Sequence, residues 1–239
     1  MRITLAQVIA IVGLIGTTRA HATVQVLYYA DVTLGTSVVP GAMALLGGGY
    51  NLVTSSTQAD FNTQLSGGAW DVVIFGEQND TIFNGSSVQL TSYLAGGGKV
   101  IGATWDSTDS SFLAMMGASY FSANPTNIGT NVDPIFNSPY ATGSNITTNN
   151  PGWGVYGLAY HPVGGAAGLG DAGGGAFGVI RGNGGRTLLN GPLFDSYGSL
   201  AQGQKLVANE IVAVATIPEP ATGGLLVLGT LFLTARRRK

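Results

Sequence analysis

Short apolar runs alternate with helix-like segments through the first hundred residues, and this alternation limits the chain to few folds. The runs lie at residues 24–30, 50–54, 70–75 and 99–105 and are rich in Val, Ile and aromatic residues. Runs that are apolar at nearly every position are typical of strands buried on both faces. Because helical segments separate them, we predict an α/β fold: a doubly wound, mostly parallel sheet in a three-layer sandwich.

Capping and glycine signals indicate where the helices lie. A helix over 33–46 is interrupted at Pro40-Gly41, and a helix over 57–65 begins at a cap, Ser56 or Thr57. Asp109 is expected to cap a short helix that runs to Met116. A helix over 86–94 has an expected inner face formed by Val88, Leu90, Tyr93 and Leu94.

The second half of the chain gives weaker signals. Residues 117–175 are rich in Asn, Pro, Gly, Ser and Thr, and we expect long loops with short strands there. Within them, residues 168–173 match G-x-G-x-x-G, but no strand precedes the match, so we interpret it as loop. A hairpin over 176–189, with a Gly-Asn-Gly-Gly turn, and a helix over 200–215 complete the expected domain.

Charge and cysteine content exclude several classes of function. Between residues 23 and 216 the chain has eleven acidic and four basic residues, so it has no basic stripe for nucleic acid. The absence of cysteine excludes disulfides, thiolate metal sites and a cysteine nucleophile. We expect no bound metal and no cofactor.

The N-terminus has the pattern of a secretory signal peptide. Arg2 is followed by an apolar run over 3–16 and by Ala20-His21-Ala22, an A-x-A cleavage site. We expect signal peptidase to cut between Ala22 and Thr23. The alternative is a buried N-terminal element, which the strand starting at Val24 disfavours.

The C-terminus combines three features in a fixed order. Pro218, Glu219 and Pro220 form an extended segment because neither proline can continue a helix. A fifteen-residue apolar run over 221–235 predicts a short transmembrane helix of about 22 Å. The cationic end should stay cytoplasmic; it consists of Arg236, Arg237, Arg238 and Lys239.

In this order, these features resemble the PEP-CTERM sorting signal. The resemblance covers residues 217–239 and implies recognition of Pro218, Glu219 and Pro220 by an exosortase, a membrane transpeptidase-like enzyme. It also implies a Gram-negative host that makes exopolysaccharide. The protein would be anchored transiently in the inner membrane and then released to the cell envelope or the exterior. An ordinary permanent anchor explains the helix and cations but not Pro-Glu-Pro.

The middle of the chain resembles the class I glutamine amidotransferase-like fold, a flavodoxin-like sandwich, over residues 24–215. The resemblance rests on the strand 70–75, the segment 94–102, the glycine-turn hairpin and the closing helix with Asn209. Enzymes of that family use a cysteine in a strand-to-helix elbow. This chain has Ala103-Thr104-Trp105-Asp106-Ser107 after its fourth strand, so amidotransferase chemistry is not implied.

Three acids follow predicted parallel strands: Asp31, Glu77 and Asp106. In open α/β sheets this edge is where ligands bind, and Asp80 and Asp109 lie nearby in sequence. Such carboxylates suit Ca²⁺ or sugar hydroxyls. The competing interpretation, which we favour, is that they cap helices and solvate loops.

Other candidate groups are weaker. Ser107 and His161 with an aspartate would make a hydrolytic triad, but Ser107 is outside a G-x-S-x-G elbow and His161 precedes a proline in a loop-rich stretch. With one histidine left after signal cleavage, a zinc site is disfavoured. Four aromatic residues are candidates either for stacking on sugars or for packing loops onto the core, namely Tyr140, Trp153, Tyr156 and Tyr160.

These observations lead to a three-part organisation: a signal peptide over 1–22, a secreted α/β domain over 23–216 and a sorting signal over 217–239. We expect the domain to be a non-enzymatic binding or structural module whose partners are extracellular polysaccharide or envelope components. The alternative is a secreted hydrolase that uses the strand-end carboxylates or Ser107.

Overall fold

The computed structural model describes residues 23–216, and in that range eleven strands form one mixed sheet. Five of them are parallel neighbours: β1 Val24–Ala30, β2 Tyr50–Thr54, β3 Val72–Glu77, β4 Val100–Thr104 and β11 Thr187–Asn190. They lie in the order β2-β1-β3-β4-β11. The predicted doubly wound α/β half is therefore confirmed.

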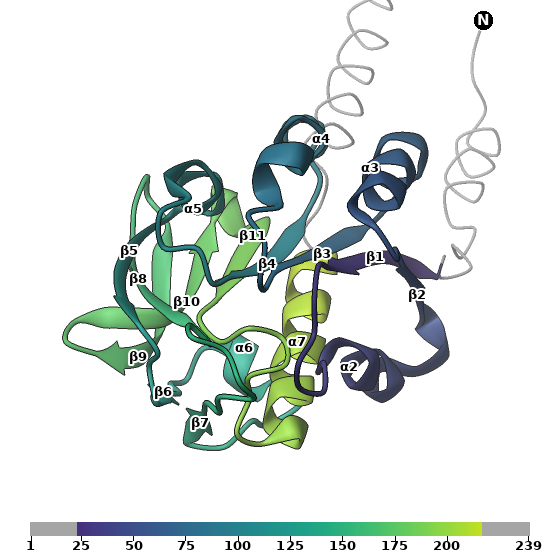
Figure 1. Cartoon of the computed structure of the whole chain (residues 1–239). Coiled ribbons are helices and arrows are strands. Elements are labelled where there is room, and N and C mark those ends of the chain that lie inside the picture. Colours follow the sequence, from purple (N-terminus) through teal and green to yellow (C-terminus); the bar gives the residue numbers. More distant parts are fainter. Residues whose placement is uncertain (1–22, 217–239) are drawn as a thin grey trace, which may run out of the picture.

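Helices cover both faces of this parallel region (Figure 1). The helix bounds are α2 Val39–Leu46, α3 Gln58–Gly67, α4 Phe83–Ala95, α5 Ser110–Met116, α6 Pro134–Asn137 and α7 Leu200–Ala215. Val26 and Tyr28 of β1 belong to the core cluster that includes residues of α2, α6 and α7, whereas Leu27 and Tyr29 belong to the cluster that includes residues of α3, α4 and α5. This alternation follows from the two-residue period of a strand and produces three layers.

The second half extends the sheet with antiparallel strands, so the sheet is mixed and not purely parallel. Strand β10 (Ala176–Gly182) pairs antiparallel with β11, with β9 (Ala167–Gly173) and with β8 (Leu158–Pro162). The remaining strands are β5 Ala118–Ala123, β6 Asn127–Gly129 and β7 Asn145–Thr147. Residues 117–175 thus hold more strand than we predicted.

Several predicted boundaries are confirmed in detail. The Thr57 hydroxyl caps α3 by accepting from the amide of Asp60 at 3.1 Å, and the Asp109 carboxylate caps α5 by accepting from the amide of Phe112 at 2.9 Å. The β10–β11 hairpin and α7 also lie where the sequence indicated, and the bounds of α7 agree to the residue.

Three local predictions were wrong. Pro40 does not interrupt a helix but lies in the first turn of α2, where a missing amide hydrogen has no cost. Val88 is 72% exposed, because α4 buries the row that contains Ser86, Leu90 and Leu94. The glycine-rich stretch 168–173 is part of β9 and not a loop, because it pairs antiparallel with β10. Glycine is required at 168, where a side chain would collide with the ring of Phe177.

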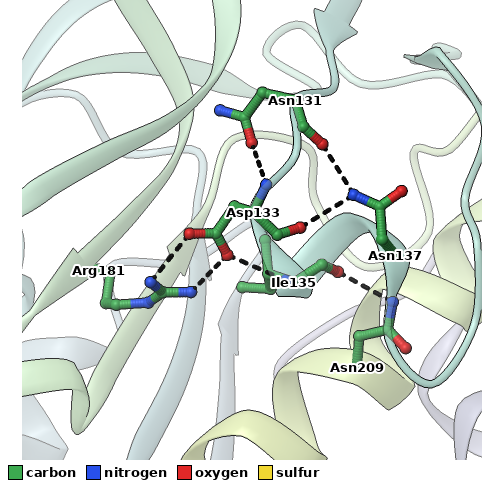
Figure 2. A network of polar contacts seen from close by, with 6 residues as sticks. All are labelled: Asn131, Asp133, Ile135, Asn137, Arg181 and Asn209. Carbon is green, nitrogen blue, oxygen red and sulfur yellow. Dashed lines mark hydrogen bonds and ion pairs between the residues drawn. The ribbon is translucent and has the colours of Figure 1, made fainter.

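A polar network joins α6, β10 and α7 (Figure 2). The Asp133 carboxylate caps α6 by accepting from the amide of Ile135 at 3.0 Å. It also binds both terminal nitrogens of Arg181, at 2.7 and 3.1 Å. The side-chain amide of Asn209 donates to the carbonyl oxygens of Ile135 and Tyr140. Asn209, one of the residues behind the fold resemblance, therefore fastens the α6 segment to α7.

No helix between residues 23 and 216 is long and apolar enough to cross a membrane. The signal peptide, the Pro218-Glu219-Pro220 motif, the apolar run 221–235 and the basic tail lie outside the described residues and remain predictions.

Candidate binding cleft

A cleft of about 220 Å³ lies at the carboxyl ends of the parallel strands. Gln78 and Asn79 directly follow β3, and Trp105 directly follows β4. The opposite wall comes from the loop before β8 and consists of Trp153, Gly154 and Val155. This edge is where open α/β sheets bind ligands, which makes the cleft the candidate functional site.

Asp31 shapes the segment that lines the cleft. It follows β1, and its carboxylate accepts hydrogen bonds from three successive backbone amides, those of Gln78, Asn79 and Asp80, at 2.7, 2.9 and 2.6 Å. Three amides that converge on one carboxylate fix the path of the loop after β3. In this structure Asp31 therefore acts as a loop-building residue.

Glu77, the last residue of β3, ties the start of α4 to the end of β4. It is wholly buried, and its two oxygens accept from the amide of Phe83 at 3.0 Å and from the hydroxyl of Thr104 at 2.7 Å. Burial raises the pKa of Glu77 to about 7. Because its side chain is inaccessible, Glu77 supports the cleft and does not line it.

Asp106 belongs to the same arrangement. Its amide donates to the Thr104 hydroxyl oxygen at 2.9 Å, and its carboxylate accepts from the amide of Thr108 at 2.7 Å. The three strand-end acids thus lie along one edge of adjacent parallel strands, as the sequence predicted. Their use in ligand binding stays a prediction, and their carboxylates are all engaged in loop structure.

The Trp153 wall is held by a buried carboxylate. The indole Nε1 donates to Asp195, at 3.0 and 3.2 Å from its two oxygens. The same carboxylate accepts from the amides of Leu34 and Gly35 at 2.8 and 2.9 Å. Gly35 lies so close that a Cβ there would be 2.6 Å from the carbonyl oxygen of Asp195. Asp195 therefore joins three loops beside the cleft.

The remaining lining groups differ in what they offer a ligand. The Gln78 side chain is buried and bonded, since its amide oxygen accepts from the amide of Phe194 at 3.0 Å and its nitrogen donates to the Val32 carbonyl. Asn79 is exposed. The indole Nε1 of Trp105 is buried and has no hydrogen-bond partner among residues 23–216.

The structure does not assemble the Ser107–His161 pair. Ser107 lies in the turn after β4, whereas His161 lies on β8 and not in a loop, with its ring 4.7 Å from that of Phe121. No hydrogen bond joins the two among the described residues. Nor do those residues include a group of three His, Asp or Glu side chains that could hold a metal ion.

Of the four candidate aromatic residues, Trp153 lines the cleft. Tyr160 is wholly buried and donates to the Asn190 carbonyl oxygen at 3.1 Å, and Tyr140 donates to the Leu45 carbonyl oxygen at 2.6 Å. Sequence reasoning missed the roles of Trp105 and Asp195. The position of Trp105 immediately after an apolar strand was the signal that could have found it.

Comparisons with known proteins support the fold and no more. No family model matches the chain, and no curated protein matches it. Among solved structures, a protein from Thermoplasma acidophilum described as part of a GMP synthase has a TM-score of 0.52 at 13% identity, covering 81% of this chain and 95% of that one. A ThuA-like protein from Parabacteroides merdae has a TM-score of 0.47 at 11% identity, covering 83% and 93%. The first likeness fits the glutamine amidotransferase-like fold.

Proposed function

We propose that residues 23–216 form an exported envelope domain that binds carbohydrate in the cleft between Trp105 and Trp153, without catalysing a reaction. The observation that carries this proposal is the presence of two indoles in one small strand-end cleft. An indole offers a flat apolar face, which suits the C–H face of a sugar ring.

The bonding of the acids supports a binding role over catalysis. Asp31, Asp106 and Asp195 all use their carboxylates to hold backbone amides, and Glu77 is buried. A general acid or base must reach the substrate proton. The hydrolase alternative depends on Ser107, and it would gain support if hydrolysis of generic esters were lost in Ser107→Ala.

Export and sorting are proposed from the terminal sequences. The signal peptide would direct residues 23–220 across the inner membrane, and the PEP-CTERM tail would present Pro218-Glu219-Pro220 to an exosortase. A domain released at the envelope of a host that makes exopolysaccharide would meet polysaccharide there. This placement agrees with a carbohydrate ligand in the cleft.

Fluorescence titration with neutral oligosaccharides tests the binding role, using protein isolated from the envelope. Trp105→Ala and Trp153→Ala should each weaken binding at least about tenfold, since each removes one stacking face. Trp70→Ala is the matched control, because Trp70 precedes β3 at the opposite edge of the sheet and donates to the Gln64 carbonyl oxygen. Equal affinity in all three variants, or no binding by the wild type, would overturn the proposal.

A further inference from the structure

We infer that the cleft takes a single, uncharged sugar unit at the end of a glycan and discriminates against acidic sugars. This inference rests on the proposed carbohydrate-binding function and adds the class of ligand. It is carried by the size of the cleft and by the distribution of charge around it, which are independent observations.

The size of the cleft limits how much of a glycan it holds. Its volume of about 220 Å³ is below the range of roughly 300–1,000 Å³ that is usual for pockets that enclose drug-sized ligands. The walls converge from three short segments, 78–79, 105 and 153–155. A space of this size holds one ring, so the next units of a chain would lie outside it.

Four carboxylates belong to residues that adjoin, or bond to, the residues that line the cleft. Asp80 is exposed one residue beyond the lining residue Asn79, and Asp31 is half-buried and bonded to the backbone of both. Asp106 directly follows the lining residue Trp105, and Asp195 holds Trp153. These groups give the cleft a negative potential.

The cations of the described domain do not offset this potential. Lys99 and Arg186 directly precede β4 and β11, at the edge opposite the cleft, and donate to the carbonyl oxygens of Ala215 and Leu94. Arg181 is paired with Asp133, and Lys205 donates to the Ala141 carbonyl oxygen. Within residues 23–216, no cationic side chain lines the cleft. A uronate would therefore meet repulsion without a compensating ion pair.

Matched methyl glycosides separate charge from shape. Methyl glucoside and methyl glucuronoside, and the corresponding galactose pair, differ at one carbon, which carries a hydroxymethyl group or a carboxylate. At low salt the neutral member should bind at least about tenfold more tightly. Raising the salt concentration should reduce the ratio of neutral to acidic affinity, because charges further apart than about 8 Å are largely screened at physiological ionic strength. A longer neutral oligosaccharide should bind no more tightly than the single ring.

Two charge variants give the matched comparison. Asp80→Asn should lower the ratio of neutral to acidic affinity. Both affinities are measured on the same variant, so a distortion of the cleft that affects both ligands equally does not change the ratio. Asp171→Asn removes the same charge from β9, across the sheet, and should leave the ratio unchanged.

The possible failures are distinguishable. Equal or tighter binding of the uronates, a ratio that is insensitive to salt and to Asp80→Asn, or affinity that rises steadily with oligosaccharide length would overturn this inference while leaving carbohydrate binding intact. Failure of every neutral glycoside and oligosaccharide to bind would overturn the proposed function and this inference with it.

Discussion

The indole Nε1 of Trp153 lies 3.0 Å from a carboxylate oxygen of Asp195, forty-two positions further along the chain. The same carboxylate accepts hydrogen bonds from the amides of Leu34 and Gly35. The buried Asp195 side chain therefore fixes both a wall of the cleft and the loop after β1. A carboxylate with several donors is well suited to this task because it offers acceptor sites in several directions.

Asp195→Asn is expected to loosen the Trp153 wall. An asparagine replaces one carboxylate oxygen by an NH2 donor. Either the amides of Leu34 and Gly35 lose the oxygen that accepts from both, or the Trp153 indole keeps only the longer of its two contacts, and the cost should be about 1–3 kcal/mol in the free energy of unfolding. Sugar affinity should fall about tenfold, and the emission of Trp153 should shift to the red in a Trp105→Phe, Trp70→Phe background. Unchanged emission and affinity would show that Asp195 does not position the indole.

Stability should fall as pH rises from about 4.5 to about 8. Glu210 on α7 is wholly buried, accepts from the Asn190 side chain at 2.8 Å, and has a pKa that burial raises from 4.5 to about 8. Burial likewise raises the pKa of Glu77 to about 7. The folded state therefore binds more protons than the unfolded state in this window, and the free energy of unfolding decreases with pH until both groups ionise in both states.

Urea unfolding at several pH values measures this dependence. Glu210→Gln and Glu77→Gln keep the shape and an acceptor oxygen but cannot ionise, so the double variant should have a flatter pH profile between 4.5 and 8. Asp60→Asn, in the first turn of α3 where the side chain is only half-buried, serves as the control with the same kind of substitution. A profile that rises with pH in the wild type would contradict the assignment.

The Asp133–Arg181 pair should contribute modestly to stability. The side chains are 18% and 30% exposed, so solvent screens part of their attraction, but the contact is bidentate and Asp133 also caps α6. Arg181→Met and Asp133→Asn should each lower the free energy of unfolding, and a double-mutant cycle should give a coupling of about 1 kcal/mol. Strict additivity of the two changes would mean that the ion pair itself adds nothing.

The N-terminus of the exported protein is expected to be Thr23. Cleavage after Ala22 leaves one residue before β1, so the strand could form in the processed chain without a change of register. N-terminal sequencing of the envelope form measures this directly. Retention of residues 1–22 would contradict the signal-peptide interpretation.

Two changes in the C-terminal tail should separate recognition by the exosortase from retention in the inner membrane. Changing Pro218, Glu219 and Pro220 to alanine should leave an uncut precursor in the inner membrane, whereas neutralising the four terminal cations should weaken retention and impair sorting. Both variants should keep a folded domain, because α7 ends at Ala215. Mass spectrometry of the mature wild-type protein is decisive: an intact Lys239 end would identify a permanent anchor and remove the sorting assignment.

The parallel half could be predicted because its strands are apolar at consecutive positions and two of its helices, α3 and α5, carry local caps. Val72, Val73, Ile74 and Phe75 are all buried, so burial on both faces is visible in the sequence itself. The strand β9 could not be predicted because Gly168 and Gly170 have no side chains, so the two-residue alternation of a strand is not visible in the sequence there. Their place in the sheet depends on close contacts with Phe177, nine positions from Gly168, and with Ile128, forty-two positions from Gly170.

The site was predictable in position but not in chemistry. Asp31 and Asp106 come just after their strands and Glu77 is the last residue of β3, so their shared edge follows from a parallel sheet. Asp31 binds the amides of residues 78–80 because the loop after β3 passes beside it. No local sequence pattern reveals the path of that loop. Asp195 was missed for the same reason: its partners belong to segments 34–35 and 153, far away in sequence.

The last strand of the described domain, β11, lies in the middle of the sheet, between β4 and β10. A chain that has emerged only as far as residue 186 therefore has β4 as an open edge, although all five residues of β4 are buried in the finished domain. Unpaired apolar edges promote aggregation. The nascent domain is consequently most vulnerable just before its final thirty or so residues arrive, and a chaperone that protects it must act until β11 has been inserted.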